Sequence, residues 1–222
     1  MLLDRRKVKF WQKIVFGFMA FLMAAFLIVG YSGVLNGCTF FNSAKSAQDQ
    51  LQQAVTQYKN AVATSPGDAT AWTRLGDNYV LLANQQKQGS AAQKDYWQQA
   101  IVAYKKADAI LSGKKGPAVK QQRLGVLQSL ISTYLFLNDY QSATDAYGEI
   151  TSLKPKDAQS YFDMATVAIN AGDTNTALLA FTKYLQLDPN SPDAAQVKAW
   201  IKQNTPKSTS TPTPTPSPSA TN

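Results

Sequence analysis

The chain has 222 residues, of which 45% are hydrophobic, 11% aromatic and 16% charged, a composition typical of a globular protein. Histidine is absent and glutamate occurs once, as Glu149, so the commonest general base and the commonest metal ligand are missing. Cys38 is the single cysteine, which excludes an intrachain disulfide and a paired-cysteine metal or redox site. Since no serine-hydrolase, phosphate-loop or metal-ligand motif is found, the sequence predicts a protein that is not an enzyme and holds no metal, cofactor or small-molecule substrate.

The N-terminal 35 residues have the pattern of a membrane anchor. A basic tail covers residues 1–13, in which five Lys and Arg residues against one Asp supply +4 of the net charge of +8. Residues 14–35 follow without a charged side chain, and 22 helical residues span about 33 Å, enough to cross a bilayer. Because basic flanks stay on the cytoplasmic side, we expect a transmembrane signal anchor in the cell membrane with a cytoplasmic N-terminus. The rest of the chain, joined through a linker at 36–42, is expected outside the cytoplasm.

Two other interpretations of this segment stay open. A cleaved signal peptide needs a small-residue cleavage site of the A-x-A kind, and none is evident. The run VLNGC resembles a lipoprotein signal, because Leu35 and Gly37 stand at fitting positions before Cys38, although Asn36 departs from the usual small or apolar residue. Lipidation would then fall on Cys38. All three interpretations place the body of the protein outside the cytoplasmic membrane.

Residues 43–204 contain an internal repeat. A small residue is followed by an aromatic residue four positions later and by a proline eight positions after that. This triplet occurs at Ala54, Tyr58 and Pro66, at Ala143, Tyr147 and Pro155, and at Ala177, Phe181 and Pro189, while Ala100 and Tyr104 repeat it without the proline. The last two triplets lie 34 residues apart, and a repeat at such a period is typical of solenoids.

A second motif precedes the triplet within each unit. It reads W-x2-L-G-x2-Y at Trp72, Leu75, Gly76 and Tyr79. Together the two motifs resemble the tetratricopeptide repeat (TPR) family, here in a membrane-anchored bacterial form. The resemblance implies an all-α solenoid of stacked helical hairpins. The small residue lets the two helices of a hairpin approach, the aromatic side chain fills the groove beside it, and the proline ends the second helix.

The expected elements follow in chain order. A single helix over 43–65 precedes three full units near 69–112, 124–157 and 158–190, with turns at Asn138-Asp139 and Gly172-Asp173. A terminal capping helix over 191–203 opens with Ser191 as its cap and buries Ala195, Val197, Trp200 and Ile201. Residues 205–222 are rich in Thr, Pro and Ser and are expected to form a disordered tail.

Two insertions lengthen the repeat. The segment NQQKQGSAAQKD lies between the two helices of the first unit, and the segment around LSGKKGPAVKQQ connects the first unit to the second. Each is either a loop on a binding face or a longer helix with a solvated turn.

The resemblance also implies a binding site, because the first helices of TPR units line a concave groove that receives a peptide or a partner helix. The matching positions here are polar and nearly uncharged: Arg74, Asp77, Asn78, Gln128, Ser129, Ser132, Gln159, Phe162, Thr166 and Asn170. A second candidate is a basic patch that would attract an anionic partner or lipid headgroups, formed by Lys105, Lys106, Lys114, Lys115, Lys120 and Arg123.

We therefore expect a membrane-tethered, extracytoplasmic scaffold that binds a protein or peptide partner. Nucleic acid is not expected, because the basic patch lacks interleaved aromatic residues for base stacking. The alternative is a lipid-anchored structural protein of the cell envelope that contacts cell-wall polymer.

Overall fold

The computed structural model describes residues 39–206, with side chains from residue 47 onward. The predicted basic tail, the apolar segment 14–35, Cys38 and residues 207–222 of the predicted tail lie outside the described residues. None of the helices within 39–206 combines the length and the apolar composition that crossing a bilayer requires.

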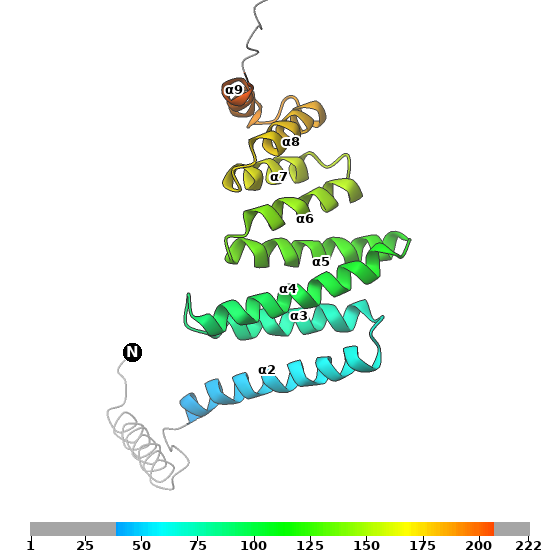
Figure 1. The fold of residues 1–222 in the computed structure, drawn as a ribbon, viewed down its shortest axis with the longest axis vertical. Coiled ribbons are helices and arrows are strands. Elements are labelled where there is room, and N and C mark those ends of the chain that lie inside the picture. Colours follow the sequence, from blue (N-terminus) through cyan, green and yellow to red (C-terminus); the bar gives the residue numbers. More distant parts are fainter. Residues whose placement is uncertain (1–38, 207–222) are drawn as a thin grey trace, which may run out of the picture. The chain divides into compact units, whose positions relative to one another are not determined.

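The chain divides into two compact units, Met1–Gln50 and Leu51–Asn222, and the repeats lie in the second. Between residues 39 and 206 the structure contains helices and no strands. The helices are α2 (Thr39–Thr64), α3 (Ala69–Asn84), α4 (Ala91–Ser112), α5 (Pro117–Phe136), α6 (Tyr140–Leu153), α7 (Ala158–Asn170), α8 (Thr174–Leu187) and α9 (Ala194–Asn204). Figure 1 shows α3 to α8 stacked with alternating direction, so that they form three antiparallel pairs. The predicted all-α solenoid of helical hairpins is confirmed for the described residues.

Short polar residues begin most of these helices. The carboxylate of Asp68 accepts hydrogen bonds from the backbone N–H groups of Thr70 and Ala71, at 2.8 and 3.2 Å. Asp139 and Asp173 accept one such bond each at the starts of α6 and α8. These side chains satisfy N–H groups that have no partner inside the helix.

The turn before α6 and the turn before α8 both contain a residue with a positive φ angle. Asn138 has a φ of 56° and Gly172 a φ of 75°, a conformation that glycine and asparagine adopt more readily than other residues. Each residue directly precedes the aspartate that caps the next helix. The predicted turns at Asn138-Asp139 and Gly172-Asp173 are therefore confirmed.

The packing of each pair follows the repeat motif. Ala100, Ala143 and Ala177 are fully buried at the crossings of the pairs. Gly76 of α3 lies directly against the ring of Tyr104 in α4, because a β-carbon added at Gly76 would come within 2.6 Å of that ring. The small residues thus let the backbones approach, and the aromatic side chains occupy the space beside them.

Both insertions lengthen helices. The first unit has only residues 85–90 between its helices, because Ser90 caps α4 and the segment AAQKD continues as helix. The second unit begins at Pro117, seven residues before the predicted start at 124, and only Gly113 to Gly116 connect it to α4. Proline is well tolerated at the first position of a helix, so Pro117 starts α5 where the sequence analysis placed a connection. Of the two interpretations, the longer helix with a solvated turn is the correct one.

The two end helices differ in detail from the prediction. Residues 39–42 of the predicted linker are helical, because α2 covers Thr39–Thr64 and no glycine or proline interrupts this stretch. At the other end, Ser191 does not cap α9, which begins at Ala194 after Asp193. The prediction that Ala195 is buried is wrong, because Ala194 and Val197 form the buried face and Ala195 is rotated away from it.

Candidate functional site

The exposed surface of the first helices α3, α5 and α7 is called the first-helix face below. Helices α3 and α5 are joined along it by one hydrogen bond, which the side-chain amide of Gln122 in α5 donates to the hydroxyl of Thr70 in α3, at 3.1 Å. All three helices run in the same direction (Figure 1), so equivalent residues line up across the face.

The structure places the predicted groove residues on these three helices with different exposure. Six are exposed: Arg74, Gln128, Ser132, Gln159, Thr166 and Asn170. Asp77, Asn78, Ser129 and Phe162 are half-buried. Several of the polar groups bond within their own helix, for example Asn78 to the carbonyl of Arg74 and Asn170 to that of Thr166. Partner binding by these residues stays a prediction.

Asp77 and Phe162 have structural contacts of their own. The hydroxyl of Tyr104 donates a hydrogen bond to Asp77 Oδ1 at 2.9 Å, and Arg74 lies 3.8 Å from Asp77 Oδ2. Burial, together with the negative charge of Asp77, raises the pKa of Tyr104 far above its usual value. Phe162 packs against Phe181 and Tyr184, with ring centroids 5.7 and 5.1 Å apart. Both residues therefore help to join the two helices of a pair.

The basic patch contains five exposed lysines and one arginine that is already paired. Arg123 of α5 donates to Asp108 of α4 at 2.7 Å and to Glu149 of α6 at 2.8 Å, and its side chain is largely buried. These carboxylates raise the pKa of the guanidinium further, so it stays charged. Lys105, Lys106, Lys114, Lys115 and Lys120 are exposed, as a patch open to an anionic partner requires. Arg123 instead holds three helices together.

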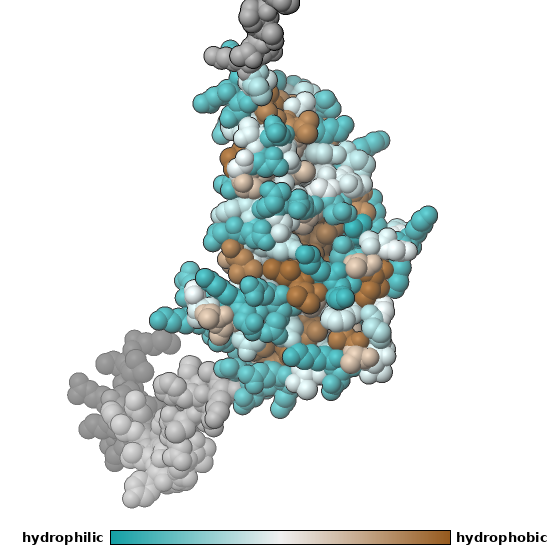
Figure 2. Space-filling model, in the orientation of Figure 1, coloured by the Kyte–Doolittle hydropathy of each residue, from teal (hydrophilic) through white to brown (hydrophobic). Residues whose placement is uncertain are grey.

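Three exposed apolar side chains that were not predicted from the sequence lie on the first-helix face. Leu81 is 48% exposed, Phe136 65% and Ile169 38%. Each residue lies near the C-terminal end of its first helix, and these ends are on the same side of the solenoid. Phe136 stacks on the buried Trp97 of α4, with ring centroids 4.7 Å apart and an interplanar angle of 14°. We call Leu81, Phe136 and Ile169, with Trp97 beneath Phe136, the apolar edge. Figure 2 shows apolar surface gathered at the level of α4 and α5, between mostly polar regions.

A signal for the apolar edge was present in the sequence. Each first helix ends in the dipeptides Val80-Leu81, Leu135-Phe136 or Ile169-Asn170, directly after the last position of the W-x2-L-G-x2-Y motif. In the first two dipeptides the first residue is half-buried and the second is exposed, because successive helix positions are rotated by about 100°. In the third dipeptide both residues are exposed, and Ile169 stands one position before the place of Leu81 and Phe136.

Comparison with known proteins supports the repeat assignment for part of the chain. Residues 130–192, from the middle of α5 to the residues after α8, match the tetratricopeptide repeat family. None of the curated proteins matches the chain.

The chain also resembles solved structures. YrrB, a TPR protein with an unusual peptide-binding site, is 21% identical with a TM-score of 0.45, over 74% of this chain and 76% of that chain. MamA is 19% identical with a TM-score of 0.44, over 72% and 85%. A thermophilic TPR protein of Thermus thermophilus is 18% identical with a TM-score of 0.43, over 69% and 74%. Identities and TM-scores this low transfer neither a binding site nor a partner.

Proposed function

We propose that this solenoid, whose residues 130–192 match the tetratricopeptide repeat, is a protein-interaction scaffold that binds its partner on the first-helix face. The observation that carries the proposal is Phe136, an aromatic ring held flat against Trp97 and still mostly exposed to water. Aromatic side chains in such positions dominate the energetics of protein interfaces. Exposed apolar groups that gather along one side of a fold indicate a contact surface.

The remainder of the first-helix face suits a rim around that anchor. Its exposed residues are polar and mostly uncharged, as in Gln128, Ser132 and Thr166. Interfaces of this kind combine an apolar centre with polar groups at the edge that form hydrogen bonds and bind water. The partner's contact region should therefore present one apolar stripe bordered by hydrogen-bonding groups.

The proposal includes the location of the scaffold. The apolar segment 14–35 and the basic residues before it favour a single-pass anchor with the solenoid outside the cytoplasm. Confinement to the membrane plane raises the effective concentration of a partner that is anchored in the same membrane. A reporter enzyme fused to the C-terminus should be active if it functions only outside the cytoplasm, and inactive if it functions only inside it. Activity of a cytoplasmic reporter would contradict the topology.

The form of the anchor is tested separately by the mass of the mature N-terminus. A signal anchor retains the residues before Cys38 and leaves its thiol unmodified. An N-terminal, acylated Cys38 would instead favour the lipid-anchored structural protein, whose tail contacts cell-wall polymer.

The partner-binding claim is tested by two matched variants of the full-length chain in crosslinking pull-downs from membranes. Phe136→Asp places a charge in the apolar edge. Leu179→Asp makes the same change at a residue of α8 that is 74% exposed and lies outside the first-helix face. We expect Phe136→Asp to lose a protein that the parent and Leu179→Asp both retain. If all three chains recover the same proteins in equal amounts, the apolar edge is not the binding surface.

A further inference from the structure

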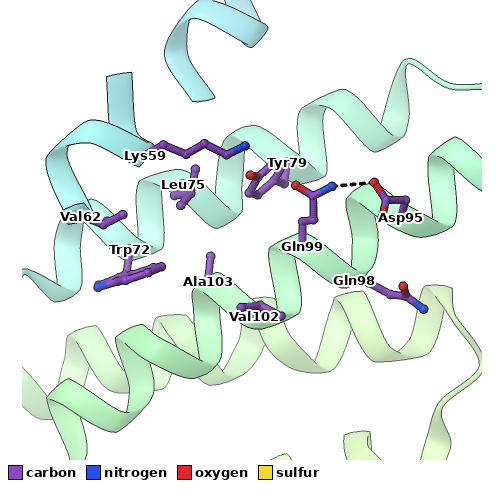
Figure 3. Close-up of a pocket in the computed structure, with 10 residues that line it drawn as sticks. All are labelled: Lys59, Val62, Trp72, Leu75, Tyr79, Asp95, Gln98, Gln99, Val102 and Ala103. Atoms are coloured by element: carbon purple, nitrogen blue, oxygen red, sulfur yellow. Dashed lines mark hydrogen bonds between the residues drawn. The ribbon is translucent and has the colours of Figure 1, made fainter. Parts of the chain in front are cut away.

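A crevice of about 470 Å³ opens between α2, α3 and α4, and none of its lining residues belongs to the apolar edge. Figure 3 shows the residues that line it. Val62 of α2, Trp72 and Leu75 of α3, and Val102 and Ala103 of α4 form an apolar part. Val102 is 58% exposed at the crevice surface. The volume lies within the range of ligand pockets and is large enough for a bulky side chain to enter.

Charged and polar groups gather at the other part of the crevice. The ammonium group of Lys59 lies 5.7 Å from the centroid of the Tyr79 ring. Among the described residues, Lys59 forms no ion pair. Asp95 accepts a hydrogen bond of 2.6 Å from Gln99 of its own helix, and no ion pair joins it to Lys59. Figure 3 shows Lys59 extending over the crevice toward Tyr79, with the Asp95–Gln99 pair beyond it. The crevice thus combines apolar walls with an available cation.

The next helix pair has a crevice at the equivalent place with the opposite chemistry. This second crevice, of about 310 Å³, is lined by Lys105, Asp108, Tyr134 and Asp145 among others. When the repeats are aligned, Lys105 corresponds to Lys59 and Tyr134 to Tyr79, so both crevices have a lysine and a tyrosine at the same places. The two crevices differ at two other positions. Asp108 replaces Val62, and Asp145 replaces Val102. In the second crevice these two positions carry carboxylates, of which Asp108 pairs with Arg123. In the first crevice the same positions are apolar, and among the described residues Lys59 has no ion-pair partner.

We propose that the first crevice is a second docking site, which takes a large apolar side chain of a partner peptide together with a neighbouring carboxylate. The apolar side chain lies against Trp72, Leu75 and Val102, where it displaces water from apolar walls. The carboxylate pairs with the exposed ammonium group of Lys59, which selects the charge of the ligand more than it adds affinity. The body of the protein favours such a partner, since the chain after residue 13 contains 17 basic and 13 acidic residues. This site is independent of the first-helix face.

The test is selection of a displayed library of random 12-residue peptides on the full-length chain in detergent. We expect enrichment of peptides in which Trp, Phe or Leu lies next to Asp or Glu. Synthetic copies of these peptides should bind the Val102→Asp and Lys59→Glu variants at least about tenfold more weakly than the parent. Selection on Lys59→Glu should enrich Lys or Arg next to the apolar residue, because the charge requirement is reversed.

Two control variants make the outcome unambiguous. Leu179→Asp changes the residue that corresponds to Val102 in the last helix pair, and Phe136→Asp changes the apolar edge; both should bind the peptides like the parent. Val102→Asp is expected to fold, because Val102 is exposed and its counterpart in α6 is already Asp145. Circular dichroism and the thermal midpoint verify this.

The proposal is overturned if no peptide is enriched, or if Val102→Asp binds as tightly as the parent. If only Phe136→Asp loses binding, the peptides bind to the first-helix face, and the proposal of a docking site in the crevice is likewise overturned. The function proposed above does not depend on this result.

Discussion

Two glycines inside first helices show how one residue type serves different purposes. Gly76 lies against the ring of Tyr104, and a β-carbon there would come within 2.6 Å of it. Gly125 of α5 is exposed and has nothing within 4 Å of an added β-carbon. The packing against Tyr104 therefore favours glycine at position 76, whereas a larger residue fits at position 125.

Alanine at these two glycines should change stability in opposite directions. Gly125→Ala should raise the free energy of unfolding by about 1 kcal/mol, because alanine favours the helix. Gly76→Ala gains the same helix-forming free energy, but the added methyl group strains the packing against Tyr104 by about 1–3 kcal/mol. We therefore expect its free energy of unfolding to fall by about 1 kcal/mol. Thermal unfolding would show midpoint shifts of a few degrees with opposite signs. Equal stabilisation by both variants would mean that Gly76 is not a packing residue.

The buried tyrosines predict how stability depends on alkaline pH. Burial raises the pKa of Tyr104, Tyr134 and Tyr147 above about 10, the usual value. A tyrosine with a raised pKa holds its proton more tightly in the folded state. Its contribution is therefore complete below pH 10 and is lost as the pH rises above that value.

Removing one of these hydroxyls should reduce the alkaline loss. Tyr104→Phe cannot ionise, so its free energy of unfolding should fall less steeply above pH 10 than that of the parent. At neutral pH the same variant should be less stable by about 1 kcal/mol, because the hydrogen bond to Asp77 is lost. Urea unfolding between pH 8 and 11 measures both effects. An identical slope in the two proteins would show that Tyr104 does not control the alkaline transition.

At the scale of the elements, Arg123 joins α4, α5 and α6 through two carboxylates. Its planar guanidinium can donate to Asp108 and Glu149 at once, which a lysine ammonium cannot do with the same geometry. We expect Arg123→Lys to lower the free energy of unfolding by about 1–2 kcal/mol. Arg74→Lys is the matched control, because Arg74 is exposed and lies 3.8 Å from its carboxylate. If the two variants lose equal stability, the three-helix link contributes nothing specific.

The solenoid could be predicted from the sequence because its packing motif is strictly spaced. Ala143 and Ala177 with their aromatic and proline partners fix where second helices pack and end, and the structure confirms these positions. Helix starts were harder to predict. Pro117 can either begin a helix or break one, and only the packing of α5 against α4 decides between the two.

Less of the candidate site could be predicted. The repeat register identifies which residues lie on first helices, but it does not show which side chains remain exposed. Phe162, which is predicted to contact a partner, is half-buried against Phe181, whereas Phe136 was not predicted and is exposed. The difference depends on the neighbouring helix, because Phe136 stacks on Trp97 of α4.

Across the whole molecule, the order in which helices open follows from their neighbours. Among the described helices, α5 packs between α4 and α6, whereas α9 packs against α8 alone. Since the stability of a solenoid depends on contacts between neighbouring repeats, we expect backbone amides of α9 to exchange with solvent faster than those of α5. Hydrogen exchange followed by mass spectrometry measures both. Equal protection of α9 and α5 would mean that the stack unfolds as one cooperative unit.

Docking of a partner protein on the apolar edge can be measured with a photocrosslinking amino acid at position 136 of the full-length chain in its native membrane. The same amino acid at position 179, on the exposed side of α8, is the control. We expect a discrete crosslinked protein from position 136 that is absent from position 179. No crosslink at position 136, or the same products from both positions, would contradict it.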